Sequence, residues 1–243
     1  MPPGLSGPLA SARILVDWAA PADGPPNPWF SWEYVRQNIE SLTSALQQHI
    51  ELTIATVAIA AAVGIPLAVL AYKVRGLTGP ILAFTGALYT IPSLALFALL
   101  GPILGLTFST VLIGLVLYAL LAIVRNALTG LRQVPPDVRD AARGMGYGRV
   151  GLLWRIELPL ALPGILTGVR IATVSTVALV TVGTLVGFGG FGDVILTGFN
   201  NNYYKAQIMA GTIGCLGLAL VLDLVLIGLG RLVMPWAARR SAP

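Results

Sequence analysis

Long apolar stretches alternate with short polar segments along most of the chain. Five of them stand out, at residues 51–72, 80–100, 108–125, 161–186 and 207–233. Each is close to the roughly 20 residues that a helix needs to cross a bilayer. Proline or glycine interrupts most of them, and such breaks are tolerated in membrane helices where neighbouring groups satisfy the freed backbone. The pattern predicts an all-α integral membrane protein with about five transmembrane helices.

The first 50 residues follow a different pattern. Residues 1–30 contain seven prolines with scattered glycine and alanine, which is typical of an extended or disordered tail. Residues 31–50 carry apolar side chains at helical spacing, including Val35 and Ile39, and predict an amphipathic helix at the membrane interface. We therefore divide the chain into this tail, this interfacial helix and a transmembrane domain over residues 51–235.

The composition agrees with a surface that faces lipid. Hydrophobic residues make up 56% of the chain and charged residues 10%, whereas charged residues make up about 25% of a soluble domain. The net charge of +5 could suggest a nucleic-acid partner, but the basic residues gather between two apolar stretches. They are Arg125, Arg132, Arg139, Arg143, Arg149 and Arg155. Such a cluster is typical of a cytoplasmic loop under the positive-inside rule, so we expect no nucleic acid.

The basic residues of the other loops predict one orientation. Those on the predicted inner side are Lys73, Arg75, Arg239 and Arg240. On the predicted outer side, residues 101–107 have none and residues 187–206 have only Lys205. We therefore expect the N-terminus outside and the C-terminus in the cytoplasm.

Residues for catalysis, metal binding or nucleotide binding are scarce. His49 and Cys215 are the only histidine and cysteine, whereas a zinc site or a disulfide framework needs several such residues. The glycine-rich run at 187–192 lacks the lysine of a phosphate-binding loop. We expect no catalytic residue, no metal and no cofactor on this chain.

The polar segment at residues 126–160 is far longer than the 2–8 residues usual between packed helices. Asp137 follows two prolines and is a candidate N-cap for a helix that begins near Val138. The glycines from Gly144 onward are expected to end that helix. A second short helix, at about 148–157, is expected before the chain returns to the membrane.

This segment carries a recognisable spacing. It runs Asp140-Ala141-Ala142, three residues, Gly146, nine residues, Ile156, one residue, Leu158-Pro159. The order resembles the Glu-Ala-Ala loop of permease subunits of ABC importers, with Asp140 in place of the usual glutamate. The longer runs ARGMGYGRVGLLWRIELPLALPGI, IPSLALFALL and LVLYALLAIVRN are similar to the glycine betaine/carnitine/choline (osmoprotectant) branch of that family.

The resemblance implies a type I importer core in a bacterial inner membrane. It implies a coupling helix, within the loop at 126–160, that docks on a cytoplasmic ATP-binding subunit present in two copies, which holds the ATP and Mg²⁺. The coupling residues it implies are Asp140, Ala141, Ala142, Arg143, Gly144, Gly146, Ile156, Leu158 and Pro159. It also implies a second permease subunit, identical or a sister chain, an extracytoplasmic substrate-binding protein, and transport of osmoprotectants by alternating access.

Two charges lie deep inside the apolar stretches, far from their ends. Arg170 and Asp223 each lie about 15 Å from the cytoplasmic surface, at roughly 1.5 Å per residue. Because intramembrane charges usually find a partner or a wet cavity, we expect them to pair; the alternative is that one of them contacts substrate. Four aromatic residues are candidate stations for a cation on the pathway, or else packing residues. They are Tyr89, Phe97, Tyr118 and Phe188.

Three other functions remain open. An ABC importer permease for methionine or an oxyanion would share the loop motif. A secondary transporter or channel would need its own coupling or filter groups, and the chain shows no two similar halves. An intramembrane enzyme would need a nucleophile with a base, an aspartate pair or metal ligands, and the apolar stretches contain one aspartate and no histidine.

Overall fold

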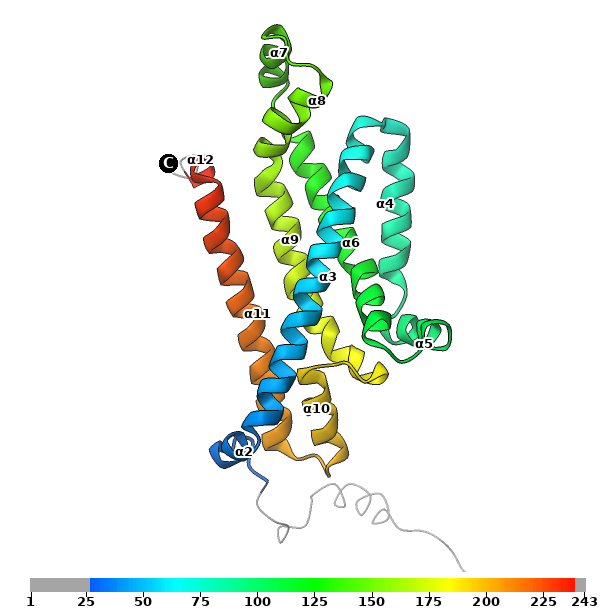
Figure 1. Ribbon diagram of the computed structural model, residues 1–243, viewed down its shortest axis with the longest axis vertical. Helices are drawn as coiled ribbons and strands as arrows, with labels where there is room; N and C mark the ends of the chain where they lie inside the picture. The colour runs from blue at the N-terminus through cyan, green and yellow to red at the C-terminus, as the bar shows by residue number, and fades with distance from the viewer. Residues whose placement is uncertain (1–26, 239–243) are drawn as a thin grey trace, which may run out of the picture.

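The protein forms an elongated bundle of helices (Figure 1). The computed structural model describes residues 27–238, and every regular element in this part of the chain is helical. Most of the predicted tail over residues 1–30 lies outside the described residues. Four helices are long and apolar enough to cross a membrane, or five if one bent pair counts as a single span, which agrees with the predicted number of spans.

The first long helix begins before the predicted membrane boundary. Residues 31–50 do not form one separate helix: α2 covers Trp32–Gln37, and α3 runs without interruption over Ile39–Lys73. Ser31 caps α2, since its Oγ accepts a hydrogen bond from the backbone N–H of Tyr34. No proline or glycine lies between Ile39 and the middle of the apolar stretch. Nothing therefore stops the helix at the expected boundary.

The second apolar stretch is not a straight span. It is divided into α4, Arg75–Thr90, and α5, Ser93–Leu104, which meet at an angle of 92°. Proline disfavours helical geometry in the residue before it, and Ile91, which precedes Pro92, is extended with φ −65° and ψ 127°. The proline break in the stretch 80–100 is therefore a sharp bend, and α5 lies at the side of the bundle next to α6 (Figure 1).

The third helix, α6, covers Phe108–Arg132 and extends seven residues beyond the predicted end at 125. Because of this extension, residues 126–132, which include Arg132, belong to the helix and not to the polar loop. The loop then contains α7, Pro136–Gly144, and α8, Arg149–Leu152.

The short helix expected to end near residue 157 does not end there. A π-helical turn, η1, at Leu153–Glu157 leads directly into α9, Leu158–Val180. Leu158 and Pro159 therefore lie inside one continuous rod. Pro159 lies directly after the π-helical turn, and such a local change of hydrogen-bond pattern accommodates the N–H that proline lacks.

After α9 the chain turns back sharply. A 3₁₀ segment, η2, at Thr181–Val186 precedes the glycine-rich turn, and the helix α10, Phe191–Asn200, was not expected. The turn is fixed to α3 by two bonds: the N–H of Gly190 donates to Gln48 Oε1 at 2.8 Å, and that of Phe191 to His49 Nδ1 at 3.3 Å.

The last long helix, α11, covers Lys205–Val233, and the short α12 covers Pro235–Ala238. The two ends of the bundle differ in what they carry. α7, α8 and α12 lie at one end, and α2 and α10 lie at the other (Figure 1). Among the described residues, the turn between α3 and α4 and the loop with α7 and α8, both assigned to the inner side by their charges, lie at the same end (Figure 1).

The helices α6 and α9 cross with almost no space between their backbones. A Cβ atom added to Gly164 would lie 2.7 Å from Gly130 Cα, and one added to Gly168 would lie 2.8 Å from Asn126 Cβ. Small residues at a crossing let two membrane helices approach closely and gain van der Waals contact. This contact holds together the two helices from which the loop at 126–160 emerges.

We expect Gly164→Ala to lower the melting temperature of the detergent-solubilised protein by several degrees. The added methyl group must push the two backbones apart, and such overpacking costs about 1–3 kcal/mol. Gly217→Ala on α11 is the matched control, because nothing lies within 4 Å of the position of its Cβ. Equal melting temperatures for the two variants would contradict this account of the crossing.

Candidate functional site

The loop between α6 and α9 extends beyond the ends of the long helices, with α7 at its far end (Figure 1). The start of α7 differs from the expectation. Pro135 occupies the N-cap and Pro136 the first helical position, and Asp137 lies in the first turn instead of at the cap. Proline suits the first turn because the N–H it lacks would have no helical partner. The carboxylate of Asp137 still stabilises the positive end of the helix dipole.

The end of α7 depends on one glycine. Gly146 has φ +87°, a left-handed conformation that glycine adopts without strain. In this conformation the N–H of Tyr147 donates to the carbonyl of Ala142 at 3.1 Å, and that of Gly146 donates to Arg143 at 2.9 Å. These two bonds satisfy carbonyls that the helix end would otherwise leave free. Gly144, in contrast, lies within the helix with open space around the position of its Cβ.

The residues of the Glu-Ala-Ala pattern differ in whether they are exposed or buried. Ala142 is buried against its own chain, whereas Asp140 and Ala141 are exposed. Arg143 Nη1 donates to Asp140 Oδ1 at 3.0 Å, and both side chains are more than half exposed. Ile156, Leu158 and Pro159 are half-buried in η1 and α9. The first half of the pattern therefore builds the exposed α7, and the second half builds the rod beneath it.

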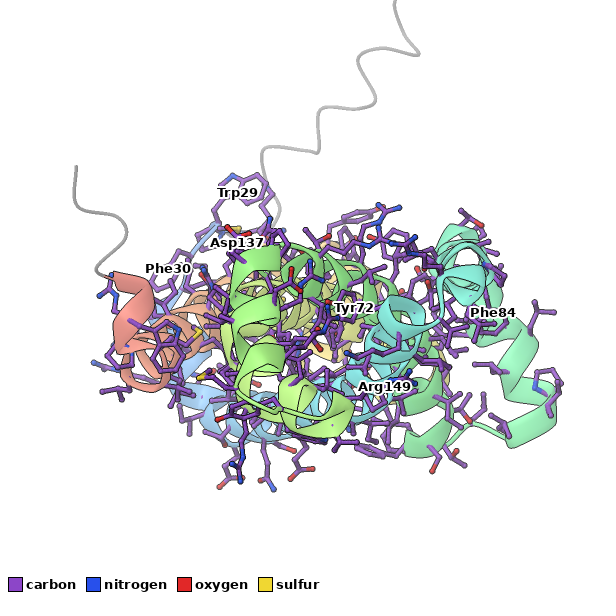
Figure 2. All side chains as sticks on the ribbon, turned by 90° about the horizontal axis from the view of Figure 1, so that it is seen from above. Trp29, Phe30, Tyr72, Phe84, Asp137 and Arg149 are labelled. Atoms are coloured by element: carbon purple, nitrogen blue, oxygen red, sulfur yellow. The ribbon has the colours of Figure 1, made fainter. Side chains whose placement is uncertain are left out.

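A buried carboxylate connects this loop to α3. Glu157 is 2% exposed, and its two oxygens accept bonds from Tyr72 Oη at 2.9 Å and Lys73 Nζ at 2.5 Å. Arg139 on α7 donates in turn to Tyr72 Oη at 2.8 Å. We call Glu157, Tyr72, Lys73 and Arg139 the anchor. Figure 2, a view onto this end of the molecule, shows Tyr72 beside α7.

Sequence reasoning missed the anchor. Arg139 was expected as one of the arginines of a cytoplasmic loop, but here it donates to Tyr72 of its own chain. One signal was present: Glu157 is the only acidic residue between Asp140 and Asp193, in a segment rich in arginine. A buried acid with several donors around it is a structural connection, because a buried charge without partners is strongly destabilising.

The outer surface of the loop carries exposed apolar side chains. Met145, Val150 and Trp154 are 70%, 71% and 67% exposed. Met145 follows α7, Val150 lies in α8 and Trp154 lies in the π-helical turn. Arg149, labelled in Figure 2, lies at this same end of the bundle. Tryptophan and arginine are enriched at the centres of protein interfaces, so this surface has the composition of a docking site.

The two intramembrane charges lie together. Arg170 on α9 donates from Nε to Asp223 Oδ1 at 2.8 Å and from Nη2 to Asp223 Oδ2 at 2.8 Å. Two parallel bonds of this kind are the strong geometry for an arginine and a carboxylate. The pair joins α9 to α11.

The four candidate pathway aromatics fall into two groups. Tyr89 and Tyr118 meet edge to face with ring centroids 5.8 Å apart and line one pocket. Phe97 is 2% exposed in a core cluster with residues of α3, α6 and η2. Phe188 packs edge to face on Phe108 at 6.1 Å. Of the four, the two tyrosines therefore share one pocket, and the two phenylalanines pack elsewhere.

The pocket lined by the tyrosines lies among α4, α6 and α9 and has a volume of about 270 Å³. Its polar lining comes from Arg125 and Asn126 on α6 and from Ser175 on α9. Among residues 27–238, no three histidine, cysteine, aspartate or glutamate side chains are grouped so that they could hold a metal ion. The chemistry offered by the pocket is that of binding, through aromatic rings, one cation and hydroxyl groups.

Comparison with known proteins identifies similar chains. A family model for the binding-protein-dependent transport system inner membrane component matches residues 42–239. The glycine betaine/carnitine/choline transport system permease protein OpuCD of Bacillus subtilis is 38% identical over 202 residues, which are 83% of this chain and 88% of that protein. The osmoprotectant import permease protein OsmW of Salmonella typhimurium is 36% identical over 198 residues, 79% of this chain and 92% of that protein.

The solved structures agree in fold. One chain of the MetNI methionine ABC transporter, in an inward-facing conformation, matches with a TM-score of 0.74 at 19% identity, over 81% of this chain and 98% of that chain. A second crystal form of the same transporter matches with a TM-score of 0.68 at 23% identity. The expected all-α core of a type I importer permease is confirmed.

We expect Glu157→Gln to lower the melting temperature by about 5 °C, because the buried group loses its charge-assisted bond to Lys73, worth about 2 kcal/mol. Asp140→Asn is the matched control: it removes an acid of the same loop from a pair that is mostly exposed, and exposed pairs contribute at most about 1 kcal/mol. Thermal unfolding of the purified variants measures both. An equal effect of the two substitutions would show that burial does not distinguish the pairs.

Proposed function

The chain belongs to the family of binding-protein-dependent transport system inner membrane components, and we propose that it carries osmoprotectants such as glycine betaine, choline and carnitine. In this proposal it is the membrane-spanning permease subunit of an ATP-driven importer and forms the translocation pathway. Its curated relatives OpuCD, OpuBD and OsmW, at 35–38% identity, are named for permeases of glycine betaine, carnitine, choline or osmoprotectants.

One observation carries the proposal of an ATP-driven importer subunit: an anchored loop that presents an exposed apolar surface. Met145, Val150 and Trp154 are exposed at its tip, while Glu157 holds its base against α3. A surface that is apolar, flanked by arginines and rigidly supported suits a protein partner, because little conformational entropy is lost when it binds. We assign this surface to the cytoplasmic ATP-binding subunit, present in two copies. ATP and Mg²⁺ belong to that subunit, and this chain performs transport and no catalysis.

The orientation follows from the same assignment. If the loop meets a cytoplasmic ATPase, the end with α7, α8 and α12 faces the cytoplasm, and the end with α2 and α10 faces outward (Figure 1). The arginines of the loop then obey the positive-inside rule. The segment 187–206, which includes α10, lies at the outer end, where we place the contact with a substrate-binding protein.

A second permease subunit completes the pathway, because five spans are too few to enclose one. It is either a copy of this chain or a sister chain. The sister arrangement draws support from Bacillus subtilis, in which two relatives of this chain, OpuCD and OpuCB, are both named as permeases of a glycine betaine/carnitine/choline system.

The anchor gives the loop a route to the membrane helices. A displacement of α7 by the ATPase acts on Tyr72 at the end of α3 through Arg139, and on α9 through the continuous rod from α8. Packed elements respond as units that shift between discrete arrangements. In this way nucleotide-driven closure of the ATPase subunits is converted into alternating access of the pathway.

The cargo is tested by uptake into proteoliposomes that contain all subunits. We expect ATP-dependent uptake of labelled glycine betaine that choline and carnitine block and methionine does not. Because Gly146 has a positive φ, a β-branched residue is strained there, so Gly146→Val should lower uptake about tenfold. Gly148→Val is the control, since Gly148 has φ −69° and open space around it. Uptake of methionine or an oxyanion in place of betaine would preserve the importer and refute the cargo.

Docking is tested by binding of the purified ATPase subunit to the permease. Trp154→Ala should weaken the affinity at least tenfold, as expected when a tryptophan at the centre of an interface is truncated. Trp236→Ala on α12 is the matched control, because Trp236 is also exposed at this end but lies outside the loop. Unchanged affinity for the Trp154 variant would exclude the assigned surface.

A further inference from the structure

The pocket among α4, α6 and α9 contains two kinds of recognition group. On one side are the rings of Tyr89 and Tyr118, and on the other are Arg125 and Asn126 with the hydroxyls of Ser175 and Thr176. Its volume of about 270 Å³ is at the lower end of the range for small-molecule sites. A small solute fits it, whereas a peptide or a lipid chain does not.

The tyrosines form a fixed aromatic corner. Their rings meet at 72° with centroids 5.8 Å apart. The hydroxyl of Tyr118 donates to the carbonyl of Ile91, which holds the ring at the bend between α4 and α5. Tyr89 is 48% exposed, so its ring is accessible. Ring faces attract a cation that has no hydrogen-bond donors of its own.

Arg125 faces the same pocket from the same helix as Tyr118. The two residues are seven positions apart, so they share one face of α6 with about 10 Å between their Cα atoms. Both side chains line the pocket, so the guanidinium and the rings face the same space. A long arginine side chain can therefore meet a solute held by the rings.

Arg125 differs from the other arginine of the membrane helices that we have described. Arg170 is held by Asp223 in a bidentate pair. Arg125 is exposed and makes no ion pair with any residue from 27 to 238. The charge pattern assigned Arg125 to the cytoplasmic cluster, and its place in the lining of the pocket makes it available to an anionic ligand group as well.

We propose that this pocket is a transient substrate site of the permease itself, selective for zwitterions that join a quaternary ammonium to a carboxylate. Tyr89 and Tyr118 take the ammonium, and Arg125 takes the carboxylate. The proposal rests on the osmoprotectant function given above. It adds a selectivity that the function alone does not contain: choline has the ammonium but no carboxylate, so Arg125 has nothing to bind in choline.

The experiment compares labelled glycine betaine with labelled choline in proteoliposomes that contain all subunits and an unaltered binding protein. Arg125→Gln is expected to lower the maximal rate of glycine betaine uptake about tenfold, as expected for loss of a charge-assisted bond, and to change that of choline less than twofold. Tyr89→Leu is expected to lower both rates, and Tyr89→Phe neither. Arg132→Gln is the control, because Arg132 lies at the end of α6 and does not line the pocket.

Arg125→Lys separates binding from a structural requirement, since it keeps the charge and is expected to retain part of the betaine rate. Equal losses of betaine and choline uptake in Arg125→Gln would overturn the proposal, and so would unchanged rates for both. If the unaltered transporter carries neither betaine nor choline but another solute, the osmoprotectant function fails and the zwitterion site fails with it. Uptake of both solutes without selective loss refutes the site alone.

Discussion

The close crossing of α6 and α9 determines where the other functional features lie. At Gly130 and Gly164 the two backbones are so near that a Cβ atom added to Gly164 would lie 2.7 Å from Gly130 Cα on the opposite helix. Both ends of the 126–160 loop emerge from these helices, so the loop stands on one rigid pair. The pocket lies between the same two helices, farther from the loop. A change in their crossing would therefore be felt at the loop and at the pocket together.

The π-helical turn η1 joins the loop rigidly to α9, and so to the pair formed by α6 and α9. If the helix had ended near residue 157, as expected, α7 and α8 would hang on a flexible joint. Instead η1 continues into α9 and places Glu157 against Tyr72 and Lys73 of α3. Isolated π-helical turns inside α-helices are rare and are frequent at functional sites. Here the turn converts a polar loop into an extension of two membrane helices.

The sequence predicted the features that local chemistry decides. Hydrophobic length gave the number of spans, and the loop spacing gave the family. Two errors have a common physical cause, because both placed an end where none exists: α3 begins at Ile39 and η1 continues into α9. Polar residues alone do not end a helix that is in contact with its neighbours. At Pro159 the π-helical turn accommodates the hydrogen bond that proline cannot donate, so the helix continues there as well.

The anchor and the pocket could not be predicted because they depend on contacts between distant segments. Tyr72 and Glu157 are 85 residues apart, and nothing in the local sequence pairs them. No local sequence pattern predicts the contact between Tyr89 and Tyr118 either, because the bend at Pro92 decides where Tyr89 lies. Only the pairing of Arg170 with Asp223 was suggested by the sequence, because two opposite charges at one depth leave few other partners.

Two arginines of the long helices differ in whether they have a partner, and this difference separates a structural role from a role in transport. A charge buried for stability alone is expected to find a fixed partner, because the cost of desolvation is recovered only by close opposite charge. Arg170 meets this condition with two bonds to Asp223. Arg125 on α6 has no such partner in residues 27–238 and lines a pocket with two aromatic rings. A charge kept unpaired beside a cation-attracting surface is suited to a ligand that brings both signs of charge and then leaves.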